Sequence, residues 1–189
     1  MRLLNAGKTL FARNGYEQTS TAAIARSAGS SESQLIRYFG GKAGLLEAIF
    51  DDSWASINDE VQQQIEKAEH GRAAIIRILS LLIQALSRDH ETAFLFLFEG
   101  RRTRGATHEV VLSKGFVQFL QIVDMLIDRG RDDGSFRTDL PATVLSSVLR
   151  GAAEGMVRDQ VLAIRNREPQ PFTDEHMLAT FAAVVNGLA

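Results

Sequence analysis

The feature that most constrains the fold of this chain is a hydrophobic repeat of about 3.6 residues that recurs almost everywhere along the sequence. Apolar side chains at this spacing share one face of an α-helix, whereas a half-buried strand requires strict alternation, and no useful alternating stretch occurs. The three prolines, Pro141, Pro169 and Pro171, all lie late in the chain. The sequence therefore predicts an all-α fold of about nine helices.

Composition excludes several classes of protein. The chain is 45% apolar and 23% charged, which is typical of a globular protein. No window supplies the roughly 18 uncharged apolar residues of a membrane-spanning helix, and no export signal opens the chain, so we expect a cytoplasmic protein. The absence of cysteine excludes disulfides and thiolate chemistry, and the four histidines are scattered. No metal and no cofactor is expected, and no membrane partner.

Charge is distributed unevenly along the sequence. The first fifty residues hold six basic and three acidic side chains, so they carry +3, although the net charge of the whole chain is −2. The remainder therefore carries −5. A basic N-terminal part on an acidic body suggests a polyanionic partner for the first part only, although chance scatter explains so small an excess equally well.

Three short helices are predicted at the start of the chain, over about Leu3–Asn14, Thr21–Ala28 and Ser31–Phe39. The third opens with Ser31-Glu32-Ser33-Gln34, which matches a capping box: Ser31 accepts from the amide of residue 34 while Gln34 reaches back. Two short helices joined by a glycine-containing turn form a helix-turn-helix. We expect Leu35 and Phe39 to anchor the third helix, which leaves an outward face for a DNA major groove.

The rest of the chain reads as longer helices. A fourth helix is expected from Lys42 to about Ile65, and the strongly apolar stretch Ala73–Leu86 predicts a central buried helix. Further helices are predicted over Glu91–Arg102, from Phe116 to about Gly130, from Pro141, in the first turn, to about Arg165, and over Thr173–Gly187. We place a helix-turn-helix domain at residues 1–44 and a helical domain at residues 45–189.

The N-terminal pattern is specific enough to compare with a known family. Its members are Leu3-Leu4, Leu10-Phe11, Gly15-Tyr16, Thr19-Ser20-Thr21-Ala22-Ala23-Ile24-Ala25, Ala28-Gly29, Leu35, Phe39-Gly40-Gly41-Lys42 and Leu45. Over about 45 residues this pattern resembles the DNA-binding domain of the TetR family of bacterial repressors. The resemblance implies a homodimer that places two recognition helices about 34 Å apart on a near-palindromic operator, and a helical body that binds a small-molecule effector.

Four positions are assigned to the phosphate backbone by this resemblance. Ser20 and Thr21, at the start of the second helix, match phosphate-contacting positions. Arg37 stands on a frequent tyrosine position and would reach a phosphate. Lys42 opens the fourth helix and is expected to bind a phosphate as well.

Base contacts are assigned to the third helix. Glu32 and Ser33 fall where the family reads bases, and Glu32 is suited to accept from a cytosine amino group. Gln34 either reads adenine or is held by the capping box. Ile36 replaces a common tyrosine and suits a thymine methyl, and Tyr38 replaces the usual histidine. Met1 lies almost at the first helix, where the family usually has a basic arm, so a weaker electrostatic contribution is expected.

The body offers candidates for a ligand pocket and for a dimer interface. Large side chains on the middle helices are the pocket candidates, each of them alternatively plain core, and the effector is expected to be largely apolar: Trp54, Phe94, Phe98, Phe116, Phe119, Met125 and Met156. The dimer candidates are a small-residue stripe on the eighth helix, which could instead pack within one subunit, and apolar residues near the C-terminus: Gly151, Ala152, Gly155, Phe181, Val185 and Leu188. Arg101, Arg102 and Arg104 either face an anionic ligand or form a solvated loop.

Two other classes of function compete with this interpretation. Gly40-Gly41-Lys42 invites comparison with a phosphate-binding loop, but Ile36 and Ala43 break that motif, and no other catalytic motif occurs, so an enzyme is not expected. A helical adaptor that binds protein or lipid is the alternative, and the sequence does not separate a repressor from an activator. The favoured hypothesis is an effector-released repressor in which the fourth helix links the ligand pocket to the helix-turn-helix.

Overall fold

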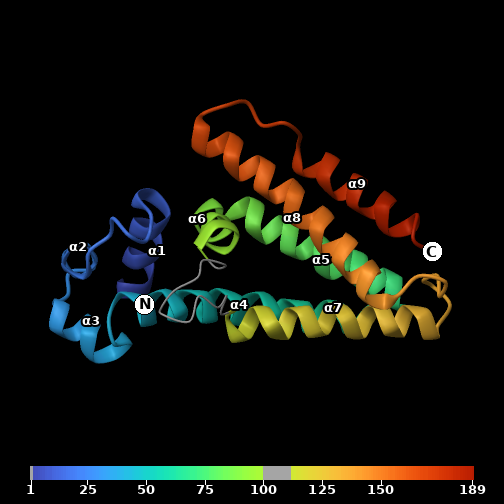
Figure 1. Ribbon diagram of the computed structural model, residues 1–189, viewed down its shortest axis with the longest axis horizontal. Helices are drawn as coiled ribbons and strands as arrows, with labels where there is room; N and C mark the ends of the chain where they lie inside the picture. The colour runs from blue at the N-terminus through green and yellow to red at the C-terminus, as the bar shows by residue number, and fades with distance from the viewer. Residues whose placement is uncertain (1, 100–111) are drawn as a thin grey trace. The chain divides into compact units, whose positions relative to one another are not determined.

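The computed structural model describes residues 2–99 and 112–189. These residues form nine α-helices and one π-helical turn, and no strand occurs among them (Figure 1). The predicted all-α fold is confirmed. The chain divides into two compact units, the first made of residues 1–56 and 91–115 and the second of residues 57–90 and 116–189. The boundary predicted between residues 44 and 45 stays a prediction.

The first unit begins with three short helices, α1 (Arg2–Asn14), α2 (Thr21–Ser27) and α3 (Glu32–Phe39). The helix α4 (Lys42–Glu66) contributes its residues up to Ser56 to this unit. The unit also contains most of α6 (His90–Phe94), which continues directly into the π-helical turn η1 (Leu95–Glu99).

Side-chain caps fix the two short helices of the turn. Ser20 and Ser31 are extended N-cap residues whose hydroxyls accept from the amides of Ala23 and Gln34, at 3.1 and 3.2 Å. Gly40 ends α3 in the left-handed region with φ 71° and donates its N–H to the Ile36 carbonyl at 2.8 Å. A glycine adopts this conformation without steric cost, so α3 stops where the sequence predicted.

The second unit is built around α5 (Gly71–Arg88). The helices α8 (Ala142–Asn166) and α9 (Asp174–Asn186) contact each other and both lie against α5 (Figure 1). The side chains of Ile75, Ile78, Leu79 and Ile83 on α5 are fully buried. The predicted central helix is therefore confirmed, except that one side of it is polar and is not buried.

A close approach of two glycines joins α5 to α7 (Lys114–Asp132). A Cβ atom added at Gly71 would lie 2.3 Å from the backbone nitrogen of Gly130. The loop after α7 caps α5 from outside: the Gly71 N–H donates to Asp133 Oδ2 at 2.7 Å and the Arg72 N–H to Ser135 Oγ at 3.1 Å. The start of α5 is thus held by side chains more than sixty residues away in sequence.

Some local predictions differ from the structure. Gln34 does not complete a capping box, because its Oε1 accepts from the Ser30 hydroxyl at 2.7 Å. Pro141 is the N-cap of α8 rather than a residue of its first turn: its extended ψ of 138° lies outside the helical region, and its carbonyl accepts from the Leu145 N–H. The helix expected from Glu91 includes a π-helical turn, which periodicity does not reveal.

Candidate DNA-binding surface and ligand groove

The outward face of α3 carries two large hydrophobic side chains that are exposed to solvent. Leu35 is fully buried, whereas the next residue, Ile36, is 52% exposed and Tyr38 is 62% exposed. Glu32, Ser33, Gln34 and Arg37 are exposed as well. Of the two predicted anchors, Leu35 is fully buried and Phe39 is half-buried, while all of the predicted base-contacting side chains face solvent.

Two of the side chains predicted to contact DNA are hydrogen-bonded to each other. The Thr21 hydroxyl at the start of α2 donates to the Glu32 carboxylate at the start of α3. This pair joins the two helices of the helix-turn-helix at their N-termini, and it orients the Glu32 carboxylate. Ser20 accepts from the Ala23 amide, so its hydroxyl hydrogen stays available to a phosphate oxygen.

The cationic candidates are also positioned by neighbours. The Arg37 guanidinium donates to the Tyr38 hydroxyl at 2.6 Å and lies 4.7 Å from the centre of that ring. The Lys42 ammonium donates to the carbonyls of Tyr16 and Glu17, at 2.9 and 3.3 Å, and lies 4.4 Å from the Tyr16 ring centre. Lys42 thus closes the turn between α1 and α2, a structural role that sequence reasoning missed.

The α6–η1 segment is tied to α1 within the first unit. The Thr9 hydroxyl donates to Glu91 at 2.8 Å, and Arg13 lies 3.8 Å from the same carboxylate. The Tyr16 N–H donates to Glu99, which is buried at the end of η1. Polar contacts therefore connect α1 with the start of the segment and the turn after α1 with its end.

The predicted pocket residues fall into several environments. Trp54 is buried beneath Phe96, with ring centres 4.7 Å apart and planes 3° from parallel, and Phe94 stacks on Phe98 at 5.0 Å. Phe119 is buried core, and Phe116 and Met156 are half-buried. Met125 is 53% exposed on α7, so within one subunit it points away from any interior pocket.

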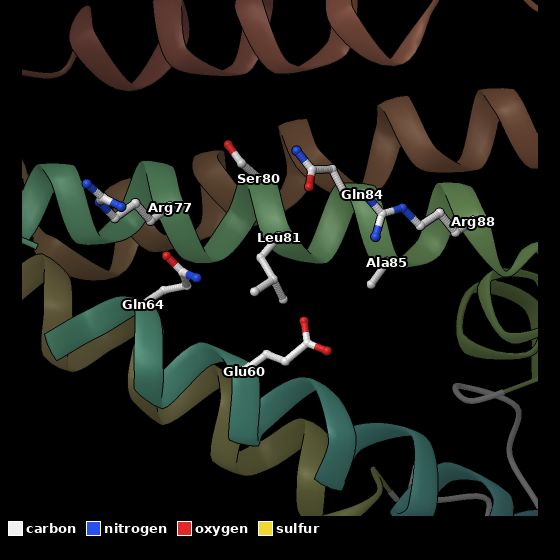
Figure 2. A pocket seen from close by; sticks show the side chains of 8 residues that line it. All are labelled: Glu60, Gln64, Arg77, Ser80, Leu81, Gln84, Ala85 and Arg88. Carbon is white, nitrogen blue, oxygen red and sulfur yellow. The ribbon is translucent and has the colours of Figure 1, made fainter. Parts of the chain in front are cut away.

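A groove lies elsewhere, between α4 and α5 of the second unit. Its volume is about 470 Å³, and Figure 2 shows Leu81 and Ala85 extending from α5 toward α4, with Glu60 and Gln64 facing them. The lining residues are Glu60, Gln64, Arg77, Ser80, Leu81, Gln84, Ala85 and Arg88. None of the predicted pocket residues lines this groove. The sequence carries no local signal for this groove, because its lining combines residues of two helices, with Arg77 and Arg88 on α5 and Glu60 on α4.

The predicted dimer residues divide between two faces. Phe181 and Val185 are fully buried inside the subunit, so assigning them to the interface was wrong: their side of α9 covers α5 and α8. Leu188 is half-buried. Gly151 is exposed, Ala152 and Gly155 are half-exposed, and a Cβ added at Gly151 would meet no described atom within 4 Å. Close packing within one subunit therefore does not explain Gly151.

Exposed apolar residues extend the Gly151 face along α8. Val144 and Val148 precede it and Leu162 follows it, and all three are exposed. The spacing of Val144, Val148, Gly151 and Gly155 keeps them on one side of the helix. The charged cluster Arg101, Arg102 and Arg104 lies outside the described residues.

No helix in the described ranges is long and apolar enough to cross a membrane. Among the same residues, no group of three or more His, Asp or Glu side chains is placed to hold a metal ion.

Comparisons with known proteins agree with this geometry. A family model described as bacterial regulatory proteins of the tetR family matches residues 3–49, and one described as the C-terminal region of YsiA-like proteins matches residues 50–167. The fatty acid metabolism regulator protein of Bacillus subtilis is 21% identical over 164 residues, which is 86% of this chain and 83% of that protein. The transcriptional repressor KstR2 of Rhodococcus jostii is 23% identical over 156 residues, covering 82% of this chain and 76% of its own.

Solved structures give the same fold. The regulator FadR from Bacillus subtilis, in complex with stearoyl-CoA, superposes with a TM-score of 0.87 at 18% identity, covering 100% of this chain and 98% of that one. The FadR protein from Bacillus halodurans gives a TM-score of 0.85 at 19% identity, covering 98% and 97%. Together, the two family models span most of the sequence and meet within α4. The chain therefore belongs to the TetR family of bacterial regulatory proteins and is a transcriptional regulator.

Proposed function

We propose that this protein represses transcription by binding a near-palindromic operator as a homodimer, with α3 in the major groove. The observation that carries the proposal is the division of α3 into one fully buried anchor, Leu35, and an exposed face that includes Ile36 and Tyr38. An eight-residue helix is not stable alone, so its exposed side chains require the support of α1 and α2. A helix of this size fits the major groove.

The contacts divide by chemistry. Glu32, held by Thr21, accepts from a cytosine amino group, and Ser33 reads the neighbouring base. Ile36 contacts a thymine methyl, and the hydrogen-bonded Arg37–Tyr38 pair contacts the phosphate backbone of the DNA. Lys42 contributes positive charge beside the phosphates while it keeps its bonds to the α1–α2 turn. Gln34 remains a candidate for adenine, although reading a base requires release from Ser30.

The dimer forms through the α8 face made of Val144, Val148, Gly151 and Leu162. Exposed valine and leucine side chains on one helix gain free energy when a partner covers them, and Gly151 lets the partner helix approach closely. A two-fold axis at this face makes the interface self-complementary. The exposed side of α9, which includes Ala179 and Ala183, supplies further small residues.

The effector is a long-chain acyl-CoA thioester. Two observations support this assignment: one relative is a fatty acid metabolism regulator, and a protein of the same fold has been solved in complex with stearoyl-CoA. Binding in the helical body shifts α4, whose first residues follow α3 directly, and the half-site spacing no longer fits the operator. Such coupling requires the effector to prefer the conformation that does not bind DNA.

The test is a fluorescence anisotropy titration against DNA from upstream of the coding region, with excess unrelated DNA, at two salt concentrations. We expect binding that survives the competitor, weakens steeply with salt, and is reversed by stearoyl-CoA but not by coenzyme A without the acyl chain. Binding that the competitor removes at low salt would contradict the operator proposal. DNA binding that persists in the presence of stearoyl-CoA would contradict only the proposal that the effector is an acyl-CoA.

A further inference from the structure

The groove between α4 and α5 contains charged side chains that the fold does not use. Within the described part of the chain, the side chains of Arg77, Arg88 and Glu60 make no hydrogen bond and no ion pair. The structural arginines of the same unit behave differently: Arg129 donates to the Ala68 carbonyl, and Arg131 to the Leu140 carbonyl. The groove therefore presents two guanidinium groups whose N–H donors have no acceptor within the described residues.

The positions of the arginines suit an elongated anionic ligand. Arg77 and Arg88 are eleven residues apart on α5, which is three helical turns, so both project from one side of the helix about 16 Å apart. Leu81 and Ala85 lie between them and face α4 (Figure 2). The ligand thus meets a cation at each end of the groove and an apolar strip in the middle.

Neutral polar groups complete the lining. Gln64 on α4 and Ser80 and Gln84 on α5 also lack a hydrogen-bonding partner within the described residues, so they too are open to a ligand. Glu60, on the wall formed by α4, is the one carboxylate of the lining, so the two arginines leave the groove with a net positive charge. The volume of about 470 Å³ falls within the range of about 300–1,000 Å³ that small-molecule sites occupy.

We propose that this groove binds the phosphate-bearing part of the effector, with Arg77 and Arg88 donating to oxygens of the 3′-phosphate and the pyrophosphate and Leu81 contacting the ribose between them. This assignment rests on the proposed function, in which the effector is an acyl-CoA. Guanidinium groups bind phosphate oxygens through paired N–H donors, and amide and hydroxyl groups satisfy the remaining acceptors. Glu60 opposes the anion and keeps the affinity of the groove moderate.

The experiment is isothermal titration calorimetry of the full chain without DNA, using coenzyme A, stearoyl-CoA and stearate as separate probes. The Arg77→Gln/Arg88→Gln double variant is expected to weaken coenzyme A and stearoyl-CoA binding by about ten-fold or more and to leave stearate unchanged. The matched control is Arg72→Gln, which removes a charge from the same helix outside the groove. It should leave all three affinities unchanged.

A variant of opposite sign separates ligand contact from loss of fold. Glu60→Gln removes the opposing carboxylate, so coenzyme A should bind about two- to three-fold more tightly, an increase that unfolding cannot produce. The proposal is overturned if wild-type protein does not bind coenzyme A, if the double variant matches Arg72→Gln, or if Glu60→Gln weakens binding. The operator titration tests the effector role independently. If stearoyl-CoA released DNA equally well from the wild type and from the groove variants, the groove assignment would be overturned, but the proposed effector would not.

Discussion

The helix α3 and the helix α5 present their functional side chains in opposite ways. The helix α3 has eight residues, buries one leucine and exposes nearly everything else. The helix α5 has eighteen residues, buries seven of them and leaves one polar side open to the groove. Residues adjacent in sequence form the DNA-binding face, whereas the groove exists only where α4 and α5 meet. A local motif therefore defines the first site, and long-range packing defines the second.

Leu35→Ala gives the largest expected effect and tests the anchor of α3. Deleting a fully buried leucine side chain costs roughly 2–5 kcal/mol of stability, and α3 has no other fully buried side chain. We expect loss of operator binding and a lower urea midpoint. Ile36→Ala, one residue later, should leave the midpoint unchanged within about 0.5 kcal/mol and alter only DNA affinity. Equal effects of the two substitutions on stability would contradict this division of the helix.

Gly71→Ala tests the long-range packing of the second unit. Its added methyl group would meet the backbone of Gly130 at 2.3 Å, which side-chain rotation cannot relieve, so we expect a loss of roughly 1–3 kcal/mol. The control is Gly187→Ala, where the nearest atom lies at 3.5 Å and little change is expected. Urea denaturation followed by circular dichroism measures both variants. A Gly71→Ala protein as stable as the control would show that the helices separate easily.

Ser31 sharpens the distinction between holding α3 and reading DNA. Ser31→Ala removes the N-cap bond to the Gln34 amide and should cost about 1 kcal/mol of stability. Ser31→Asp keeps a capping oxygen and stability close to that of the wild type, but adds negative charge next to the phosphates. We expect the aspartate variant to bind DNA more weakly than the alanine variant while melting at a higher temperature. The reverse order in both assays would argue against α3 facing DNA.

The smallest expected effect concerns Asp133 at the start of α5. Hydrogen bonding from the Ser135 side chain, and then from the Gly71 N–H, lowers the pKa of Asp133 below its ordinary value of 3.8. Because the folded pKa is the lower one, the ionised group stabilises the fold above the ordinary pKa, and this contribution is lost as pH falls through the folded pKa. The stability difference between wild type and Asp133→Asn should therefore shrink with acidification. Urea titrations across the acidic range measure it, and a difference independent of pH would contradict the capping role.

The two regions also differ in how far the sequence predicts them. The caps at Ser20 and Ser31, the left-handed Gly40 and the buried Leu35 were all predictable, because each depends on residues within a few positions. The Lys42 bond to the α1–α2 turn was not, since it joins residues about 25 positions apart. The same reason explains the outcome for Phe181 and Val185: periodicity identifies an apolar face, but not whether a helix of the same subunit or a partner covers it.

The groove illustrates the same limit. Large aromatic residues are the pocket candidates that the sequence offers, yet Trp54 packs against Phe96 and Phe94 against Phe98. The groove is lined instead mostly by polar and charged residues, with Leu81 and Ala85 between the two arginines, and periodicity does not show that these residues face another helix. A charge without a partner is visible only once the surrounding helices are in place.

The most direct test of the central claim, that α3 reads a DNA sequence, is selection of binding sites from a random DNA library by wild-type protein and by Glu32→Gln and Ser33→Ala. The account predicts one near-palindromic consensus for the wild type and a changed base preference at matching positions of both half-sites for each variant. Enrichment of no sequence, or an identical consensus from all three proteins, would contradict it.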